Sequence, residues 1–186
     1  MPKVALKNHP CTPCRFVSEF EVDAEWQIDN LLVLRYSIHG DLSRLLFPAS
    51  ADVRRCDELW KHSCFEAFLK NRNSERYYEL NFASSRAWAC YRFVSYRNGM
   101  SAHTNAKPPE ILVRPSPQAF EFEARIDLSD LILSNGPLDL ALSAVIETEE
   151  RTLSYWALTH PPGRPDFHHP DAFILEIHPT ARRIGL

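Results

Sequence analysis

The chain has 186 residues, enough for one domain with a sizeable core, and its 21 basic and 24 acidic side chains give a formal net charge of −3. These charges are interspersed, so no cationic face is available for a duplex and we expect no nucleic-acid partner. No apolar run approaches the roughly 20 residues that cross a bilayer, and no signal region is visible, so we expect no membrane partner and a cytoplasmic location.

Strand signals dominate the chain from end to end, with period-2 alternation between turn-forming clusters and no long helices between the strands. The predicted strands are 16–26, 31–40, 60–69, 77–83, 88–99, 110–116, 120–128, 138–150, 154–159 and 172–178. Short helical turns are predicted within 41–48 and 127–136. This pattern predicts an all-β fold in which residues 1–186 form a single-domain two-sheet β-sandwich, jelly-roll-like, with about ten strands.

Five cysteines, an odd number, indicate reduced thiols rather than a disulfide framework. Cys11 and Cys14 have CxxC spacing. They lack the second ligand pair of a zinc site and the strand–helix context of a redox motif, so an incidental pair is favoured.

The predicted strand 60–69 carries an unusual mixture of side chains on one face. Alternation places its even positions together, namely Trp60, His62, Cys64, Glu66 and Phe68. Tryptophan with glutamate on a sheet surface suits sugar-like ligands, because apolar CH faces stack on rings while hydroxyls meet polar groups. The alternative is an ordinary solvated face on which tryptophan covers apolar stems.

The next predicted strand, 77–83, continues this mixture. Tyr77, Glu79 and Asn81 form its polar set, and the strand 88–99 adds aromatic and donor groups. Glu66 and Glu79 could also be a carboxylate pair for glycoside hydrolysis, which requires a separation across a cleft of about 5 Å or about 6.5–9.5 Å. Both interpretations remain open from these residues alone.

Three separated segments then resemble one known family in order. They are LWKHSCFEAFL, YYELNFASSRAWACYRFVSYRNGM and SYWAL…DFHHPDAF, within residues 59–177. Together they resemble the DOMON-like domains related to family 9 carbohydrate-binding modules. The chain departs from the family pattern at Ala83-Ser84-Ser85, where a proline often stands.

The resemblance implies a jelly-roll β-sandwich with a ligand site on one side, where relatives bind sugars between aromatic side chains and others hold haem. The residues that match the family pattern are Glu66, Tyr78, Glu79, Asn81, Trp88, Tyr91, Trp156, His169, Pro170 and Asp171.

The late segment 154–173 holds three histidines and four prolines and invites several interpretations. A zinc or iron(II) site would combine His160 and Asp166 with His168 or His169, although adjacent histidines point to opposite sides of an extended chain. Haem ligation by a histidine is a further alternative. Otherwise His169 and Asp171 tie a proline-stiffened loop to the sheet, or the loop forms a wall of a ligand pocket.

We therefore predict a non-catalytic domain that binds a saccharide or similar small polar ligand, without metal or cofactor. The predicted ligand-binding residues are Trp60, Glu66, Tyr78, Glu79, Asn81, Trp88, Tyr91, Trp156, His160, Asp166 and His169. The alternative is a hydrolase, metal-dependent or carboxylate-based, that uses Glu66, Glu79 and the loop histidines. A domain that docks onto a protein partner is a third hypothesis.

Overall fold

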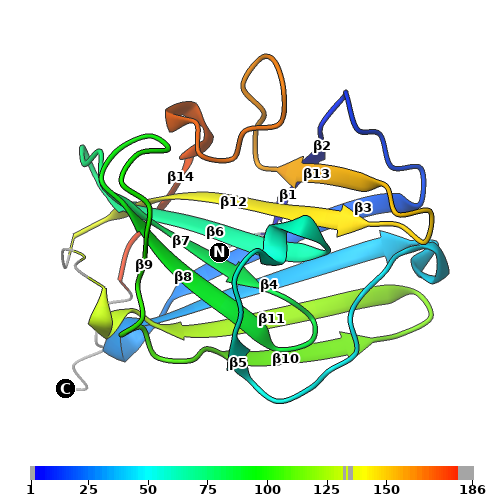
Figure 1. The fold of residues 1–186 in the computed structure, drawn as a ribbon, viewed down its shortest axis with the longest axis horizontal. Coiled ribbons are helices and arrows are strands. Elements are labelled where there is room, and N and C mark those ends of the chain that lie inside the picture. Colours follow the sequence, from blue (N-terminus) through cyan, green and yellow to red (C-terminus); the bar gives the residue numbers. More distant parts are fainter. Residues whose placement is uncertain (1–2, 132, 134–135, 180–186) are drawn as a thin grey trace, which may run out of the picture.

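The computed structural model describes residues 3–131, 133 and 136–179, which form two packed β-sheets (Figure 1). The five-stranded sheet has the order β1 (Val4–Ala5), β3 (Val17–Trp26), β4 (Leu31–Gly40), β11 (Ala119–Asp127), β10 (Glu110–Pro115). All of its pairs are antiparallel, and β3 carries a register shift between Val17 and Glu19.

The nine-stranded sheet is longer and carries two side branches. Its order is β2 (Lys7–Asn8), β13 (Leu153–Ala157), β12 (Leu138–Glu147), β6 (Cys64–Asn71), β7 (Tyr77–Phe82), β8 (Ala87–Phe93), β5 (Arg54–Arg55). In addition, β14 (Leu175–Ile177) pairs with β12 and β9 (Ser101–Ala102) pairs with β8. Only β5 runs parallel to its neighbour among the described pairs.

The expectation of an all-β two-sheet sandwich is confirmed. Each of the ten predicted strands is present, and the additional ones in the described chain, β1, β2, β5 and β9, have two residues each. The predicted helical turns are the 3₁₀ helices η2 (Leu42–Arg44) and η4 (Leu128–Asp130), while positions 132 and 134–135 of the second lie outside the described residues. No described helix is long and apolar enough to span a membrane.

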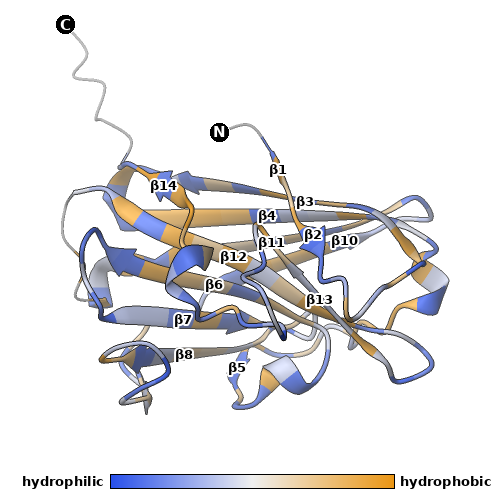
Figure 2. Ribbon diagram, turned by 90° about the horizontal axis from the view of Figure 1, so that it is seen from above, coloured by the Kyte–Doolittle hydropathy of each residue, from blue (hydrophilic) through white to orange (hydrophobic). Residues whose placement is uncertain are grey.

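The main core lies between the sheets, where alternate residues of each strand meet. Figure 2 shows hydrophobic and hydrophilic residues alternating along β3. Rings from both sheets fill the centre: Phe65 of β6 stacks on Phe122 of β11 at 4.2 Å between ring centroids, and Tyr36 of β4 lies 5.0 Å from Phe65. The Tyr36 hydroxyl donates a hydrogen bond to the Glu66 carbonyl at 3.0 Å, so this buried polar group is satisfied.

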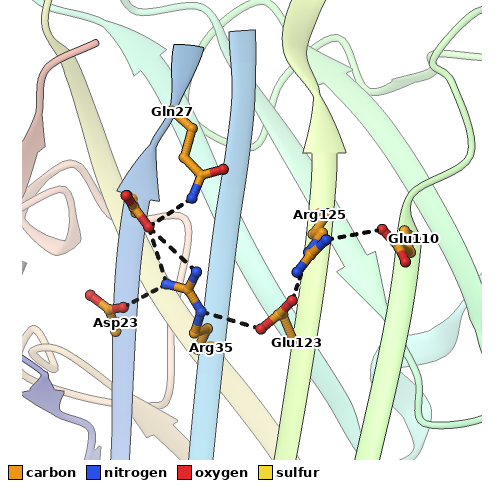
Figure 3. Close-up of polar contacts among 7 residues, drawn as sticks. Asp23, Gln27, Arg35, Glu110, Glu123 and Arg125 are labelled. Carbon is orange, nitrogen blue, oxygen red and sulfur yellow. Dashed lines mark hydrogen bonds and ion pairs between the residues drawn. The ribbon is translucent and has the colours of Figure 1, made fainter. Parts of the chain in front are cut away.

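The outer face of the five-stranded sheet carries a ladder of alternating charges (Figure 3). Arg35 on β4 lies 2.9 Å from Asp23, 3.3 Å from Glu25 and 3.2 Å from Glu123. Arg125 lies 2.7 Å from the other oxygen of Glu123. Each acidic side chain of this ladder therefore has a cation beside it.

Candidate functional site

The outer face of the nine-stranded sheet has a second apolar cluster with carboxylates among its rings. On β6, Phe65 points into the main core. Side chains alternate along a strand, so Glu66 and Phe68 lie together on the opposite, outer face. On β7, Glu79 sits opposite Phe68 across the ladder, and Asn81 sits opposite Glu66. Adjacent strands thus place two glutamates diagonally on one face.

A cavity of about 320 Å³ opens over this face. It is lined by Trp60, Glu66, Glu79, Phe93, Arg97, Met100, Val145, Tyr155, Pro165, Phe167 and His168. Strands β6, β7, β8, β12 and β13 contribute the floor, while Trp60 comes from the 3₁₀ helix η3 (Leu59–Lys61). The hairpin after β8 and the loop after β13 provide the remaining walls, and both project from the same side of the fold (Figure 1).

Both glutamates of the cavity are buried. Only 3% of Glu66 and 4% of Glu79 is exposed. Glu79 accepts a hydrogen bond from the Asn81 amide at 2.7 Å, whereas Glu66 Oε1 is buried and has no hydrogen-bond partner in the described part of the chain. Burial raises the pKa of Glu66 well above its ordinary value, and the neighbouring Glu79 raises it further; burial also raises the pKa of Glu79, to about 7.

His168 reaches the cavity from the late loop and is held in one orientation. The backbone N–H of Arg97 donates to the Tyr77 hydroxyl at 3.2 Å, and that hydroxyl lies 2.9 Å from His168 Nδ1. When the hydroxyl donates to Nδ1, the neutral ring carries its proton on Nε2, which lies 3.9 Å from Glu79 Oε2. Burial, followed by the charge of Arg97, lowers the pKa of His168 to about 4, so the ring is neutral at pH 7.

Asp166 fastens the late loop to the hairpin after β8. Its Oδ1 accepts from Arg97 Nη2 at 2.7 Å and from Arg97 Nε at 3.1 Å, and its Oδ2 accepts from the Tyr96 hydroxyl. Although burial opposes ionisation, these hydrogen bonds keep the pKa of Asp166 below its ordinary value. The expected tie through His169 and Asp171 is instead local, because His169 Nδ1 accepts from the Asp171 backbone N–H at 3.2 Å.

Several predicted ligand-binding residues lie in or beside this cavity. Trp60, Glu66 and Glu79 line it, and the Asn81 amide donates a hydrogen bond to Glu79. Trp60 was predicted to lie on a strand, but β6 begins only at Cys64. The ring of Trp60 packs against that of Tyr91, with 5.7 Å between their centroids. Tyr91 therefore braces one wall of the cavity.

The predicted loop residues are divided. Asp166 holds the loop that forms one wall of the cavity, whereas His169 is not among the lining residues and its ring contacts that of Tyr96, with 5.9 Å between the centroids. His160 does not line the cavity: it packs against His9 at 4.8 Å, and its Nε2 lies 2.7 Å from the Lys7 carbonyl.

Three predicted residues lie on the other side of the sheet. Tyr78, Trp88 and Trp156 are 5%, 5% and 6% exposed and belong to the main core between the sheets. The cross-strand register explains this placement, because Trp88 pairs with Phe82 and Trp156 with Ala144, both inward-facing. They do not share a face with Glu66, and a ligand-binding role for them stays a prediction without geometric support.

The cavity also contains residues that were absent from the prediction. They are Phe93, Arg97, Met100, Val145, Tyr155, Pro165, Phe167 and His168. Opposite orientations of His168 and His169 were expected from their adjacency, but which one faces inward depends on the path of the loop. Arg97 lies within the predicted strand 88–99 but beyond the observed end of β8 at Phe93, and it is 69 residues from its partner Asp166, so no local pattern connects them.

The metal alternative required several ligands to converge on one ion. Within residues 3–131, 133 and 136–179, no group of three or more histidine, cysteine, aspartate or glutamate side chains is close enough to hold one. His160, Asp166 and His168 are instead engaged with Lys7, Arg97 and Tyr77, respectively.

Three solved structures have a similar fold. A protein of Bacteroides uniformis to which carbohydrate binding is ascribed superposes with a TM-score of 0.66 at 15% identity, covering 93% of this chain and 84% of its own. A family 9 carbohydrate-binding module from Caldicellulosiruptor kristjanssonii in complex with cellotriose gives 0.57 at 15% identity, covering 97% and 83%. The same type of module with glucose gives 0.52 at 16% identity, covering 97% and 87%.

These similarities establish the fold, a β-sandwich like that of the family 9 modules. No protein-family model matches the chain, and no curated protein matches it.

Proposed function

We propose that the chain binds a saccharide or similar small polar ligand in the cavity on the outer face of the nine-stranded sheet. The observation that carries this proposal is the pairing of buried carboxylates on the floor with aromatic walls. Sugar hydroxyls can donate to Glu66, whose Oε1 has no donor among the described residues, while Trp60 and Phe167 offer apolar surface to the sugar ring.

The size of the cavity is consistent with a small ligand. At about 320 Å³ it lies at the lower end of the roughly 300–1,000 Å³ typical of ligand pockets. The fold supports the same proposal, since similar structures were solved with cellotriose and glucose bound.

Binding without catalysis is favoured over hydrolysis by the position of the carboxylates. A glycosidase places its two carboxyl groups on either side of the scissile bond. Glu66 and Glu79 project from adjacent strands of one sheet, on the same wall of the cavity. They are therefore placed to hold one face of a ligand.

Isothermal titration with glucose and cellotriose tests the proposal. We expect binding by the native chain, and roughly tenfold or greater weakening in Trp60→Ala because a stacking surface is lost. Trp88→Phe is the matched control, since Trp88 lies in the core, and its affinity should be unchanged. Native affinity in Trp60→Ala, or no binding of either sugar, would contradict the proposal.

A further inference from the structure

Two buried carboxyl groups, Glu66 and Glu79, line the cavity without a hydrogen-bonded cation among the described residues. Arg97 is the one cationic side chain among the described residues that line it; it makes two hydrogen bonds to Asp166, and its charge lowers the pKa of both glutamates without a described hydrogen bond to either. His168, 3.9 Å from Glu79, is neutral at pH 7 for the reasons given above. Because Arg97 is hydrogen-bonded to Asp166, its charge acts on the two glutamates only from a distance, and burial, the larger influence, keeps the pKa of both raised.

A buried carboxylate pair in this position must either hold protons or receive a cation from outside. Buried charges in proteins are ordinarily paired, because an unpaired one loses its hydration without compensation. Glu66 adds a second observation: its side chain lines the cavity, and its Oε1 is buried and accepts no hydrogen bond from any described residue. An ammonium group would supply both the missing donor and the missing positive charge.

The walls suit such a group. Trp60, Tyr155 and Phe167 surround the same cavity as Glu66 and Glu79. Aromatic faces attract ammonium ions through their quadrupoles, most strongly where water is excluded. Carboxylates on the floor with rings on the walls therefore form a site that distinguishes a cationic ligand from a neutral one of similar shape.

We propose that the natural ligand of this cavity carries a protonated amine, as an amino sugar does, and that its ammonium group binds between Glu66 and Glu79. This inference rests on the proposed function and refines its ligand class. The titratable and charged groups that interact with the pair are Cys64, Tyr77 and Cys90 on the nine-stranded sheet, Tyr36 on the five-stranded sheet, Arg97 on the hairpin and His168 on the late loop.

Proton release accompanies this binding mode. Below pH 7 the pair retains protons, and a bound cation favours the ionised carboxylates, so protons leave as the amine binds. A neutral sugar has no equivalent charge and releases fewer protons. Titrations in two buffers of different ionisation enthalpy measure this difference.

The test compares glucose, glucosamine and choline as titrants at a pH just below 7. We expect glucosamine to bind at least roughly tenfold more tightly than glucose, with release of protons. Glu66→Gln should remove most of this advantage, with Glu79→Gln as a second variant if the first folds poorly. Glu123→Gln is the matched control because it makes the same change on the opposite outer face, and it should preserve the advantage.

Each outcome separates the two proposals. Equal affinity for glucose and glucosamine overturns the amine inference and leaves saccharide binding intact. Binding of glucosamine without glucose or cellotriose supports the amine inference and contradicts binding of neutral sugars, and binding of choline as well shows that the positive charge suffices without an N–H donor. No binding of any of the three overturns both, and an advantage that persists in both Glu66→Gln and Glu79→Gln overturns the assignment of the carboxylates.

Discussion

The outer faces of the two sheets both carry acidic side chains, but they neutralise them in different ways. On the five-stranded sheet, Arg35 and Arg125 join the carboxylates into a ladder that is complete within the protein (Figure 3). On the nine-stranded sheet, Glu66 and Glu79 are more deeply buried, and no described lysine or arginine is hydrogen-bonded to them. A complete ladder stabilises a surface, whereas incomplete pairing under a cavity leaves interactions for a ligand to make.

The largest expected effect is that of removing one unpaired carboxylate. The pKa of Glu79 is raised to about 7 in the folded chain, so between pH 4.5 and pH 7 the unfolded state ionises while the folded state keeps its proton. Stability therefore falls as the pH rises through this window. Glu79→Gln should flatten that slope and increase the free energy of unfolding at pH 8 by on the order of 3 kcal/mol.

Urea unfolding across this pH range measures the effect. Gln can still accept the hydrogen bond from Asn81, so the change mainly removes the charge. Identical slopes for the native chain and Glu79→Gln would show that the two outer faces do not differ in the way described.

Removing the central cation of the ladder should have the opposite sign. Arg35→Met leaves Asp23, Glu25 and Glu123 without their shared partner, and Glu123 is only 9% exposed in its side chain. Because Arg35 is 36% exposed and solvent screens the pairs, we expect a loss of about 1–2 kcal/mol at pH 7. The loss should shrink at acidic pH as the carboxylates become protonated.

Arg72→Met is the control for this change, since Arg72 is 49% exposed and pairs with Glu176 at the surface. Denaturant unfolding should show little change there. A comparable loss in both variants would mean that the ladder has no special role.

Local alternation predicted much of the fold and part of the site. It predicted β4 with the same bounds as are observed, and it placed Glu66 and Phe68 on one face of β6. It did not establish the phase of β8 relative to β7, which depends on the pairing of Trp88 with Phe82 across the sheet. A one-residue shift moves a side chain to the other face, so the tryptophans were the residues most easily misplaced.

The walls of the cavity were less accessible to such reasoning. They depend on loops that meet only in the folded chain, through contacts such as Arg97 with Asp166 and Tyr77 with His168. No local sequence pattern predicts either contact, because the partners lie 69 and 91 residues apart. The composition of the late loop suggested a site, but only its anchors determine which side chains face the cavity.

The smallest expected effect concerns the rim of the cavity, where the late loop meets the hairpin after β8. Here the binding face does contain an ion pair, between Arg97 and Asp166. Asp166→Asn removes the anion that holds Arg97 and Tyr96, and with Arg97 52% exposed the global cost should stay below about 1 kcal/mol. The local effect should be clearer: backbone amides of 160–168 should exchange faster with deuterium because the loop loses its anchor. Asp171→Asn is the matched control in the same loop. The Asp171 side chain is 82% exposed, and His169, at 3.7 Å, is its one ion-pair partner among the described residues. Equal exchange in both variants would show that the rim does not depend on Asp166, and that the cavity wall is held by the His168–Tyr77 contact instead.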